Sequence, residues 1–414
     1  MGRTVHLTRG GVGRRLGWPG VLLLVALASC TAASTRPAAT PDAALLGYFP
    51  TDDAHARARF RGGCRRIAPG ACGSWSLGGA GRDLTIEHAF FGGGGDRLLV
   101  IQSGIHGPEA PAGAAVQALV LDRHLPRLLA RGIDVFLIHA LNPYGVRYGR
   151  RTDAANVNLN RNFSPDGSAY RTRNPRYARY RELFEPSGPV RDATLASLAI
   201  GLRLVGAYLG AGFSAGPINE GLNSGQYEFP RGLNYGGAGP AEQSAFLRAR
   251  LAPVLARGYR KALFLDVHTG LGEAGVLAVL RGLRPPPALL GELEAMLRGY
   301  EREGIVVRSG EDPGFYPTTG DVIDFVPALS PEPDAVLAVT LEYGTLGDDA
   351  LSRLRSAARL ILENQAHFHG CTRREVCEAV ARGFRELFNP SSPEWRLGVV
   401  RKAERVLDAL VERY

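Results

Sequence analysis

Short apolar runs alternate with polar loops along most of the chain. The runs at residues 98–102, 134–139, 262–267 and 335–341 are rich in β-branched residues and predict four buried strands. Alternating apolar and polar positions over residues 83–91 predict a further strand. Polar residues follow closely after each of the four buried strands, so side chains that can carry chemistry come directly after them.

Apolar residues at helical spacing predict helices between these strands. The helices are expected at residues 46–70, 111–129, 193–209, 241–257, 351–367 and 399–413. Strands that alternate with helices favour an α/β fold, which we expect as a single domain with a mixed central β-sheet flanked by helices. In such sheets, ligands bind at the carboxyl ends of the strands.

The first 29 residues have the pattern of an export signal. Four arginines come first, and the apolar run at residues 21–27 that follows is too short to span a bilayer. The string Leu27-Ala28-Ser29-Cys30 resembles a bacterial lipoprotein box, in which the cysteine is lipidated and becomes the new N-terminus. A plain secretory signal with a chance cysteine is the alternative. We expect a signal peptide at 1–29, a flexible tether at 30–45 and a catalytic domain at 46–414, exported and lipid-anchored at the membrane surface or in the periplasm of a bacterial cell envelope.

The other four cysteines form two pairs that are close in sequence, Cys64 with Cys72 and Cys371 with Cys377. An oxidising compartment would allow two disulfides, and four unrelated thiols are the alternative. The formal charge of +9 includes the four arginines of the signal, and no dense basic tract with interleaved aromatic residues occurs. Nucleic-acid binding is therefore not expected.

Three of the predicted strands end in side chains suited to metal-dependent hydrolysis. His106 and Glu109 follow the first buried strand, and His268 ends the third. Imidazole and carboxylate are both good zinc ligands, and three such ligands leave a fourth position open for water. Asp266 lies on the same strand face as His268 and could orient it. Glu342 ends the fourth strand and is a candidate general base, with a core salt bridge to an arginine as the alternative.

A polar loop follows the second buried strand. It carries Arg150, Arg151, Asn160 and Arg161. Arginine binds carboxylates through a planar fork, so such a loop suits a free carboxylate together with the oxyanion of a tetrahedral intermediate. For these residues taken alone, a solvated basic loop is the alternative.

Together these pieces resemble the zinc carboxypeptidase family. The order of motifs in that family is H-x-x-E, N-P-x-G, an Arg, D-x-N-R-N, a His that ends a strand, Tyr-x-x-x-Gly and a strand that ends in Glu. The chain has the same order, and the similarity extends from about residue 46 to the C-terminus. The resemblance implies one Zn²⁺ ion bound by His106, Glu109 and His268, with Glu342 as general base and Arg151 polarising the scissile carbonyl.

The same resemblance assigns the substrate contacts. It implies that Asn160 and Arg161 grip a terminal carboxylate of the substrate and that Tyr316 closes over it. Two departures from the family pattern bear on specificity: Gly-Pro stands inside the H-x-x-E motif, where digestive carboxypeptidases have a substrate-contacting Arg, and Asn158 stands where Asp is usual. Within the family, the chain looks most like an uncharacterised bacterial branch, a domain of unknown function related to aspartoacylase-like deacylases.

The expected function is a zinc-dependent hydrolase that cleaves an amide bond next to a free carboxylate, as a metallocarboxypeptidase does with peptides. A zinc-dependent deacylase of N-acyl amino acids is the first alternative. Ser214 lies in a G-x-S-x-G string and would serve a serine hydrolase, but that elbow needs a strand before the serine, and the preceding residues look helical. A non-catalytic surface lipoprotein is the last alternative. Glu342 argues against it, because a binding module needs no base.

Overall fold

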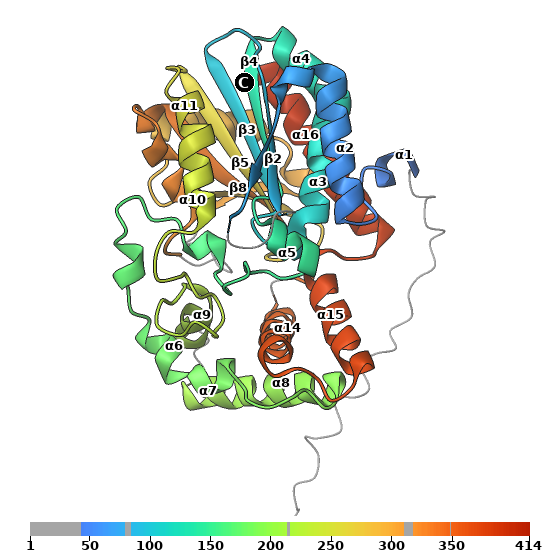
Figure 1. Ribbon diagram of the computed structural model, residues 1–414, viewed down its shortest axis with the longest axis vertical. Coiled ribbons are helices and arrows are strands. Elements are labelled where there is room, and N and C mark those ends of the chain that lie inside the picture. Colours follow the sequence, from blue (N-terminus) through green and yellow to red (C-terminus); the bar gives the residue numbers. More distant parts are fainter. Residues whose placement is uncertain (1–42, 79–83, 213–215, 310–317, 348) are drawn as a thin grey trace, which may run out of the picture. The chain divides into compact units, whose positions relative to one another are not determined.

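A mixed β-sheet lies at the centre of the computed structural model, which describes residues 43–414 except 79–83, 213–215, 310–317 and 348 (Figure 1). The eight strands have the order β1-β2-β4-β3-β5-β8-β6-β7 across the sheet. They are β1 Cys72–Ser76, β2 Thr85–Phe91, β3 Arg97–Ser103, β4 Ile133–His139, β5 Lys261–Thr269, β6 Leu277–Arg281, β7 Ile305–Ser309 and β8 Val336–Tyr343. β4, β3, β5 and β8 are parallel neighbours, whereas β2 and β6 join the sheet antiparallel. The predicted α/β class with a mixed sheet is confirmed.

The central strands bury side chains on both faces. On β5, Leu263, Leu265 and Val267 belong to one core, and Ala262 and Phe264 belong to the other. Successive side chains of a strand point to opposite faces, so a strand that is covered on both sides has a continuous apolar sequence. This is why the predicted apolar runs became the central strands.

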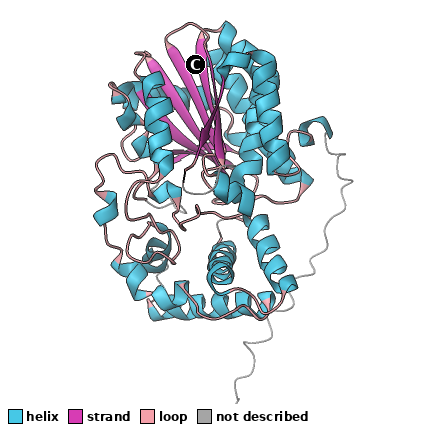
Figure 2. Cartoon of the chain, viewed as in Figure 1, coloured by secondary structure: helices cyan, strands magenta, loops and turns pink. Residues whose placement is uncertain are grey.

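Helices cover both faces of the sheet (Figure 2). The larger core lies between the sheet and α1 Ala43–Leu46, α2 Asp53–Ile67, α3 Ala110–Leu119, α4 Leu125–Ala130, α12 Pro287–Leu297 and α16 Pro393–Arg413. The second core lies under α10 Glu242–Phe246, α11 Ala252–Leu255 and α13 Val322–Phe325. Both cores include side chains from the strands and from the helices that cover them, so they hold the strands in place.

A separate group of helices lies beyond the carboxyl ends of the parallel strands, in the lower part of Figure 1. It comprises α5 Pro143–Tyr148, α6 Pro175–Arg179, α7 Arg181–Phe184, α8 Ala193–Gly210, α9 Gly216–Asn223, α14 Ala350–His369 and α15 Arg374–Phe388. Helices α6 to α9, α14 and α15 share a small core of their own, which includes Tyr177, Leu204 and Ile361. This group covers the edge of the sheet at which the predicted site residues emerge.

Both predicted cysteine pairs are disulfides in the structure. Cys64–Cys72 joins α2 to the start of β1, and Cys371–Cys377 closes the turn between α14 and α15. The domain also begins slightly before the expected residue 46, because Leu45 of α1 is buried. Cys30 and the signal peptide lie outside the described residues.

Four predicted helices differ from expectation in their details, and the one expected at 399–413 begins earlier, at Pro393. The helix expected at 46–70 begins only at residue 53, where the Asp52 carboxylate accepts a hydrogen bond from the N–H of His55 and caps it. The helices expected at 111–129 and 241–257 each contain a turn of π-helix, at Val120–His124 and Leu247–Leu251. A proline, Pro126 or Pro253, follows each π turn, and proline supplies no N–H for the regular helical hydrogen bond.

Candidate metal centre

The site is assembled where β3, β5 and β8 end side by side. β3 pairs with β5 and β5 pairs with β8, all parallel, so their carboxyl ends meet at one edge of the sheet. His268 at the end of β5 lies directly opposite Glu342 on β8. His106 and Glu109 follow β3 in the loop and the 3-10 turn Gly107–Glu109. The strand order therefore brings together residues that are far apart in sequence.

Two close backbone approaches fix the loop that carries His106. Gly104 has φ +69°, a conformation that favours glycine, and its backbone passes close to Ala140. A Cβ atom on Gly107 would lie 2.0 Å from the backbone of Gly145, so only glycine fits there. Gly107, inside the H-x-x-E motif, thus lets this turn pack tightly against α5, and the packing positions His106 and Glu109.

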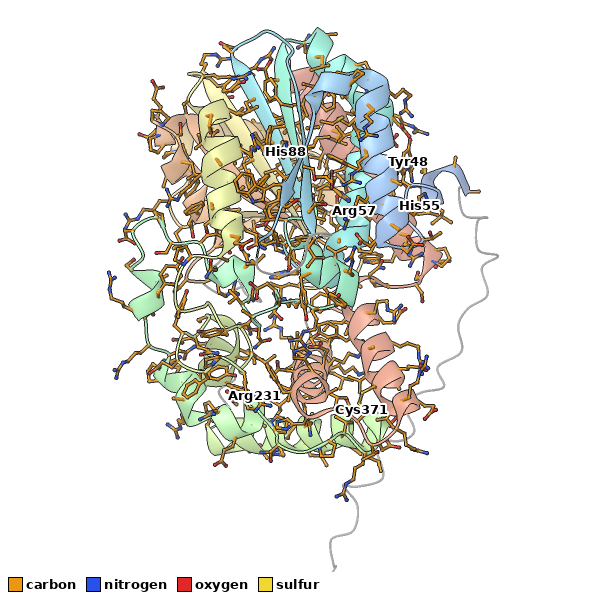
Figure 3. All side chains as sticks on the ribbon, viewed as in Figure 1. Tyr48, His55, Arg57, His88, Arg231 and Cys371 are labelled. Atoms are coloured by element: carbon orange, nitrogen blue, oxygen red, sulfur yellow. A yellow bond between two sulfur atoms is a disulfide. The ribbon has the colours of Figure 1, made fainter. Side chains whose placement is uncertain are left out.

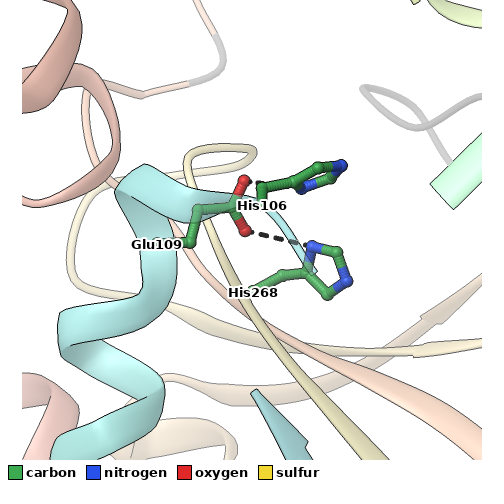
Figure 4. A group of neighbouring side chains, drawn as sticks. All are labelled: His106, Glu109 and His268. Atoms are coloured by element: carbon green, nitrogen blue, oxygen red, sulfur yellow. Dashed lines mark hydrogen bonds and ion pairs between the residues drawn. The ribbon is translucent and has the colours of Figure 1, made fainter. Parts of the chain in front are cut away.

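One nitrogen of each histidine faces the carboxylate of Glu109 (Figure 4). His106 Nδ1 lies 2.8 Å from Glu109 Oε1, and His268 Nδ1 lies 3.1 Å from Glu109 Oε2. All three side chains are at most 5% exposed. Ligand atoms of the three residues lie within 4.8 Å of one another, which is the spacing of a group that could hold a metal ion.

The other nitrogen of each histidine has its own partner. His106 Nε2 lies 3.0 Å from Asn158 Oδ1, and His268 Nε2 lies 2.6 Å from Asp266 Oδ2. Asn158 Oδ1 also accepts a backbone N–H two residues further on, so this oxygen is the acceptor and His106 Nε2 is the donor. The tautomer that follows leaves the Nδ1 lone pair pointing at a carboxylate. Two acceptors that face each other in this way fit a cation between them.

Burial and neighbouring charges set the protonation of the site. Burial, together with the charge of Arg151, lowers the pKa of His106 to about 4. Burial also acts to lower the pKa of His268, but Asp266 and Glu109 hold it well above its ordinary value. Burial alone would raise the pKa of Glu109, and the two histidines instead hold it well below its usual range. A metal ion bound here would displace a proton of His268, so its affinity would depend on pH.

Glu342 is buried beside the three ligands. Its Oε1 atom accepts a hydrogen bond of 2.9 Å from the backbone N–H of Leu271. Burial raises the pKa of Glu342 to about 8, with the charge of His268 opposing and that of Glu109 adding to the rise. A carboxyl group with a raised pKa inside a cleft is typical of general acid–base residues.

Arg151 joins the site from the loop after α5. Its Nη1 donates to Asn234 Oδ1 over 3.2 Å, and its guanidinium lies 5.7 Å from the ring centre of Phe388. Its Nε atom is buried and makes no hydrogen bond within the part of the chain that the structure describes. Arg151 therefore brings a fixed positive charge to the site and keeps an N–H available.

Asn234 connects Arg151 with His106 through Asn158. The same Asn234 Oδ1 atom accepts a hydrogen bond of 2.6 Å from Asn158 Nδ2, and Asn158 in turn holds His106. Asn234 has φ +50°, a left-handed conformation that asparagine tolerates better than most residues. This arrangement explains why Asn158 replaces the usual Asp, because an aspartate has no N–H to donate to Asn234 Oδ1.

Comparison with known proteins places the chain. Residues 52–402 match the sequence model of DUF2817, described as a protein of unknown function. The chain belongs to the DUF2817 family. No curated protein matches it.

The DUF2817 chain is also similar to several solved structures. Carboxypeptidase A from Helicoverpa armigera is 16% identical with a TM-score of 0.43, over 81% of this chain and 74% of that one. A protein from Shewanella amazonensis, provisionally classed as a metallopeptidase, is 16% identical with a TM-score of 0.41, over 77% and 94%. The succinylglutamate desuccinylase from Chromobacterium violaceum is 16% identical with a TM-score of 0.32, over 73% and 72%.

A cavity of about 590 Å³ opens in front of these residues in the DUF2817 chain. Asn160 and Arg161 line it, but their hydrogen bonds tie loops together. Asn160 bonds to Asp321 and to the N–H of Val322, and Arg161 donates to the carbonyl oxygens of Asn160 and Asn223. Their grip on a substrate carboxylate stays a prediction, and Tyr316 lies outside the described residues.

Several residues that line the cavity could not be recognised as site residues from the sequence. Arg353 and Ser356 of α14 and Phe388 at the end of α15 line the cavity, although they come from ordinary amphipathic helices. Asn234 lies in a Gly-rich loop of the DUF2817 chain. The glycines indicate an irregular backbone, but they do not predict that Asn234 accepts hydrogen bonds from Arg151 and Asn158. Ser214 also lies outside the described residues, and the element before it is the helix α8 rather than the strand that a serine elbow needs.

Proposed function

We propose that this protein is a zinc-dependent hydrolase that cleaves an amide bond next to a free carboxylate, acting on the C-terminal end of peptides. One observation carries the proposal. The Nδ1 atoms of His106 and His268 and the carboxylate of Glu109 converge on one point, with Glu342 adjacent on the next strand. Two imidazoles and one carboxylate are a ligand set of catalytic zinc, which keeps a further position open.

The residues present fit such an ion. The lone pairs that face each other at Glu109 and His106 favour a cation between them, and Asn158 and Asp266 fix the ring nitrogens that point toward it. When bound, zinc would supply Lewis acidity toward a carbonyl oxygen and lower the pKa of water.

Side chains of the protein supply proton transfer, charge stabilisation and substrate binding. Glu342 takes a proton from the water that attacks the amide carbon, and returns it to the nitrogen of the leaving amine as the C–N bond breaks. Arg151 supplies positive charge for the oxygen that becomes negative in the tetrahedral intermediate. Arg161 lines the cavity and would attract a substrate carboxylate, and Tyr316 would close over the substrate.

We further propose that the protein is exported and held at the bacterial cell envelope by a lipid on Cys30. The basic and apolar order of the first 29 residues and the string before Cys30 support this location. The two disulfides, Cys64–Cys72 and Cys371–Cys377, are in keeping with an oxidising compartment.

A mass-spectrometric screen tests the function. Purified protein is incubated with a peptide library and with N-acyl amino acids, with and without a chelator. Release of C-terminal amino acids that stops with the chelator and returns with zinc supports the proposal. Cleavage of N-acyl amino acids alone would replace it with the deacylase alternative. Activity that resists the chelator, or that Ser214→Ala abolishes while His106→Ala does not, would overturn it.

A further inference from the structure

Helix α8 presents a continuous apolar stripe to solvent. Leu195, Leu198, Leu202, Val205 and Leu209 are 66%, 58%, 63%, 40% and 51% exposed, and together they are five of the eight large hydrophobic residues that the structure describes as exposed. Their spacing alternates between three and four residues, so all five lie on one side of the helix. Single exposed leucines are common, but a stripe of this kind marks an interaction surface.

The opposite side of α8 belongs to the folded domain. Ile200 and Leu204 are buried in the small core shared with α14 and α15. Just before the helix, the backbone of Val190 forms hydrogen bonds with Gly370 and Thr372. These residues flank Cys371, which is labelled in Figure 3 and forms a disulfide with Cys377. By length and composition α8 could cross a membrane, but its inner side is part of the core. The helix therefore lies on the surface with its stripe facing outward.

The segment that precedes α8 carries a net positive charge. The segment 171–192, which contains α6 and α7, has six arginines and three acidic residues. It packs directly against α8, where Arg203 donates to the carbonyl oxygen of Glu182. Three of these arginines pair with carboxylates, Arg173 with Glu228, Arg176 with Glu220 and Arg181 with Glu185. The other three, Arg171, Arg179 and Arg191, are exposed. An exposed apolar stripe next to a segment with exposed arginines is complementary to an anionic phospholipid surface, in which apolar side chains enter the acyl region and cations meet the headgroups.

A second copy of the chain fits the stripe less well. The exposed parts of these five side chains amount to about 500 Å², which is below the roughly 800 Å² per partner of a standard protein interface. Pairing two α8 helices would also bring the two arginine-rich segments toward each other, and like charges that face across an interface are unfavourable. We propose that α8 is a membrane-docking surface for an anionic lipid bilayer.

This surface is independent of the proposed hydrolase. It acts in addition to a lipid on Cys30: a lipid chain alone would leave the domain free to turn at the end of its tether, whereas α8 fixes one side of it against the bilayer. Helix α9, which lines the active-site cavity, follows α8 in the chain after a short connection, so docking sets how the cavity lies relative to the membrane.

Vesicle flotation tests the proposal. Mature protein that begins at residue 30, with Cys30→Ser so that it carries no lipid, is mixed with vesicles of phosphatidylglycerol and phosphatidylcholine, or of phosphatidylcholine alone. The expected result is binding to the anionic vesicles that falls at least tenfold in the triple variant Leu198→Gln, Leu202→Gln, Leu209→Gln. The matched control Tyr148→Gln, Leu351→Gln removes two exposed apolar residues elsewhere and should bind as before.

A second variant keeps the test independent of any loss of folding. Arg179→Gln with Arg191→Gln changes two exposed arginines, leaves the leucines in place and should weaken binding to anionic vesicles severalfold, more at low salt than at high salt. Equal binding of the parent and the leucine variant, or no binding by the parent, would overturn the proposal. So would a dimer in sedimentation analysis that the leucine variant converts to a monomer, since that result would assign the stripe to a second copy.

Discussion

Replacing Asp266 by Asn removes one negative charge beside His268 and leaves the volume of the side chain almost unchanged. Asp266 is fully buried, and its two oxygens accept hydrogen bonds from His268 Nε2 over 2.6 Å and from Gln102 Nε2 over 3.0 Å. Gln102 Oε1 makes no hydrogen bond among the described residues, so a flip of that amide would satisfy the new asparagine. The fold should therefore persist, and the change should act on the metal.

The size of the effect follows from the lost charge. A hydrogen bond to a charged group contributes roughly 1.5–3 kcal/mol and a neutral one roughly 0.5–1.5 kcal/mol, so Asp266→Asn should weaken metal binding by about 1–2 kcal/mol. This is about 5- to 30-fold in the dissociation constant. The difference in metal affinity between Asp266→Asn and the unchanged protein should become smaller at lower pH. Asp266 also holds the pKa of His268 above its ordinary value, so the unchanged protein must release that proton before it binds a metal.

Competition with a chromophoric zinc chelator, repeated at several pH values, measures this. Asp134→Asn is a matched control, because Asp134 is a buried carboxylate near the other end of the sheet that bonds to Tyr259 and to Gly93. It should cost stability and leave zinc affinity unchanged. Equal affinity of Asp266→Asn and the unchanged protein at every pH, or an equal loss in the control, would refute the orienting role of Asp266.

Three further outcomes are expected. Glu342→Gln should lower kcat about 10²- to 10⁴-fold and keep one zinc per chain by elemental analysis, and turnover near the original rate would remove Glu342 from the mechanism. In chelator-treated protein, the raised pKa of Glu342 means that the folded state keeps a proton that the unfolded state releases. The contribution of Glu342 to stability should therefore fall as pH rises from about 4.5 toward about 8. In urea unfolding, the stability of the unchanged protein relative to Glu342→Gln should decrease over this range, whereas parallel curves would contradict the assignment. Asn234→Ala removes the acceptor shared by Asn158 and Arg151 and should lower kcat about tenfold or more. Asn234→Asp keeps the accepting oxygen and should retain more activity. An equal loss in both variants would count against a role of this oxygen in positioning Asn158 and Arg151.

The central sheet and the grouping of His106, Glu109 and His268 could be predicted, because buried strands have continuous apolar sequences and these residues lie at or just after their ends. The strands β3, β5 and β8 are covered on both faces, and each leads directly to a titratable side chain. Strand β1 is polar and lies at the edge of the sheet, while β6 and β7 are short, so none of them has a pattern that distinguishes a strand from a loop.

The supporting contacts could not be predicted in the same way. Asn234 lies 76 residues beyond Asn158, and only the folded loops bring their side chains together. The stripe on α8 was part of a predicted helix, but its periodicity does not say which side of that helix would face the core.

The most direct measurement of the central claim is crystallographic. Crystals grown with zinc are measured on both sides of the zinc absorption edge. One anomalous peak should lie about 2.0–2.2 Å from His106 Nδ1, His268 Nδ1 and an oxygen of Glu109. A map with no peak among these atoms, or with the ion bound elsewhere on the chain, would contradict the assignment of the metal centre.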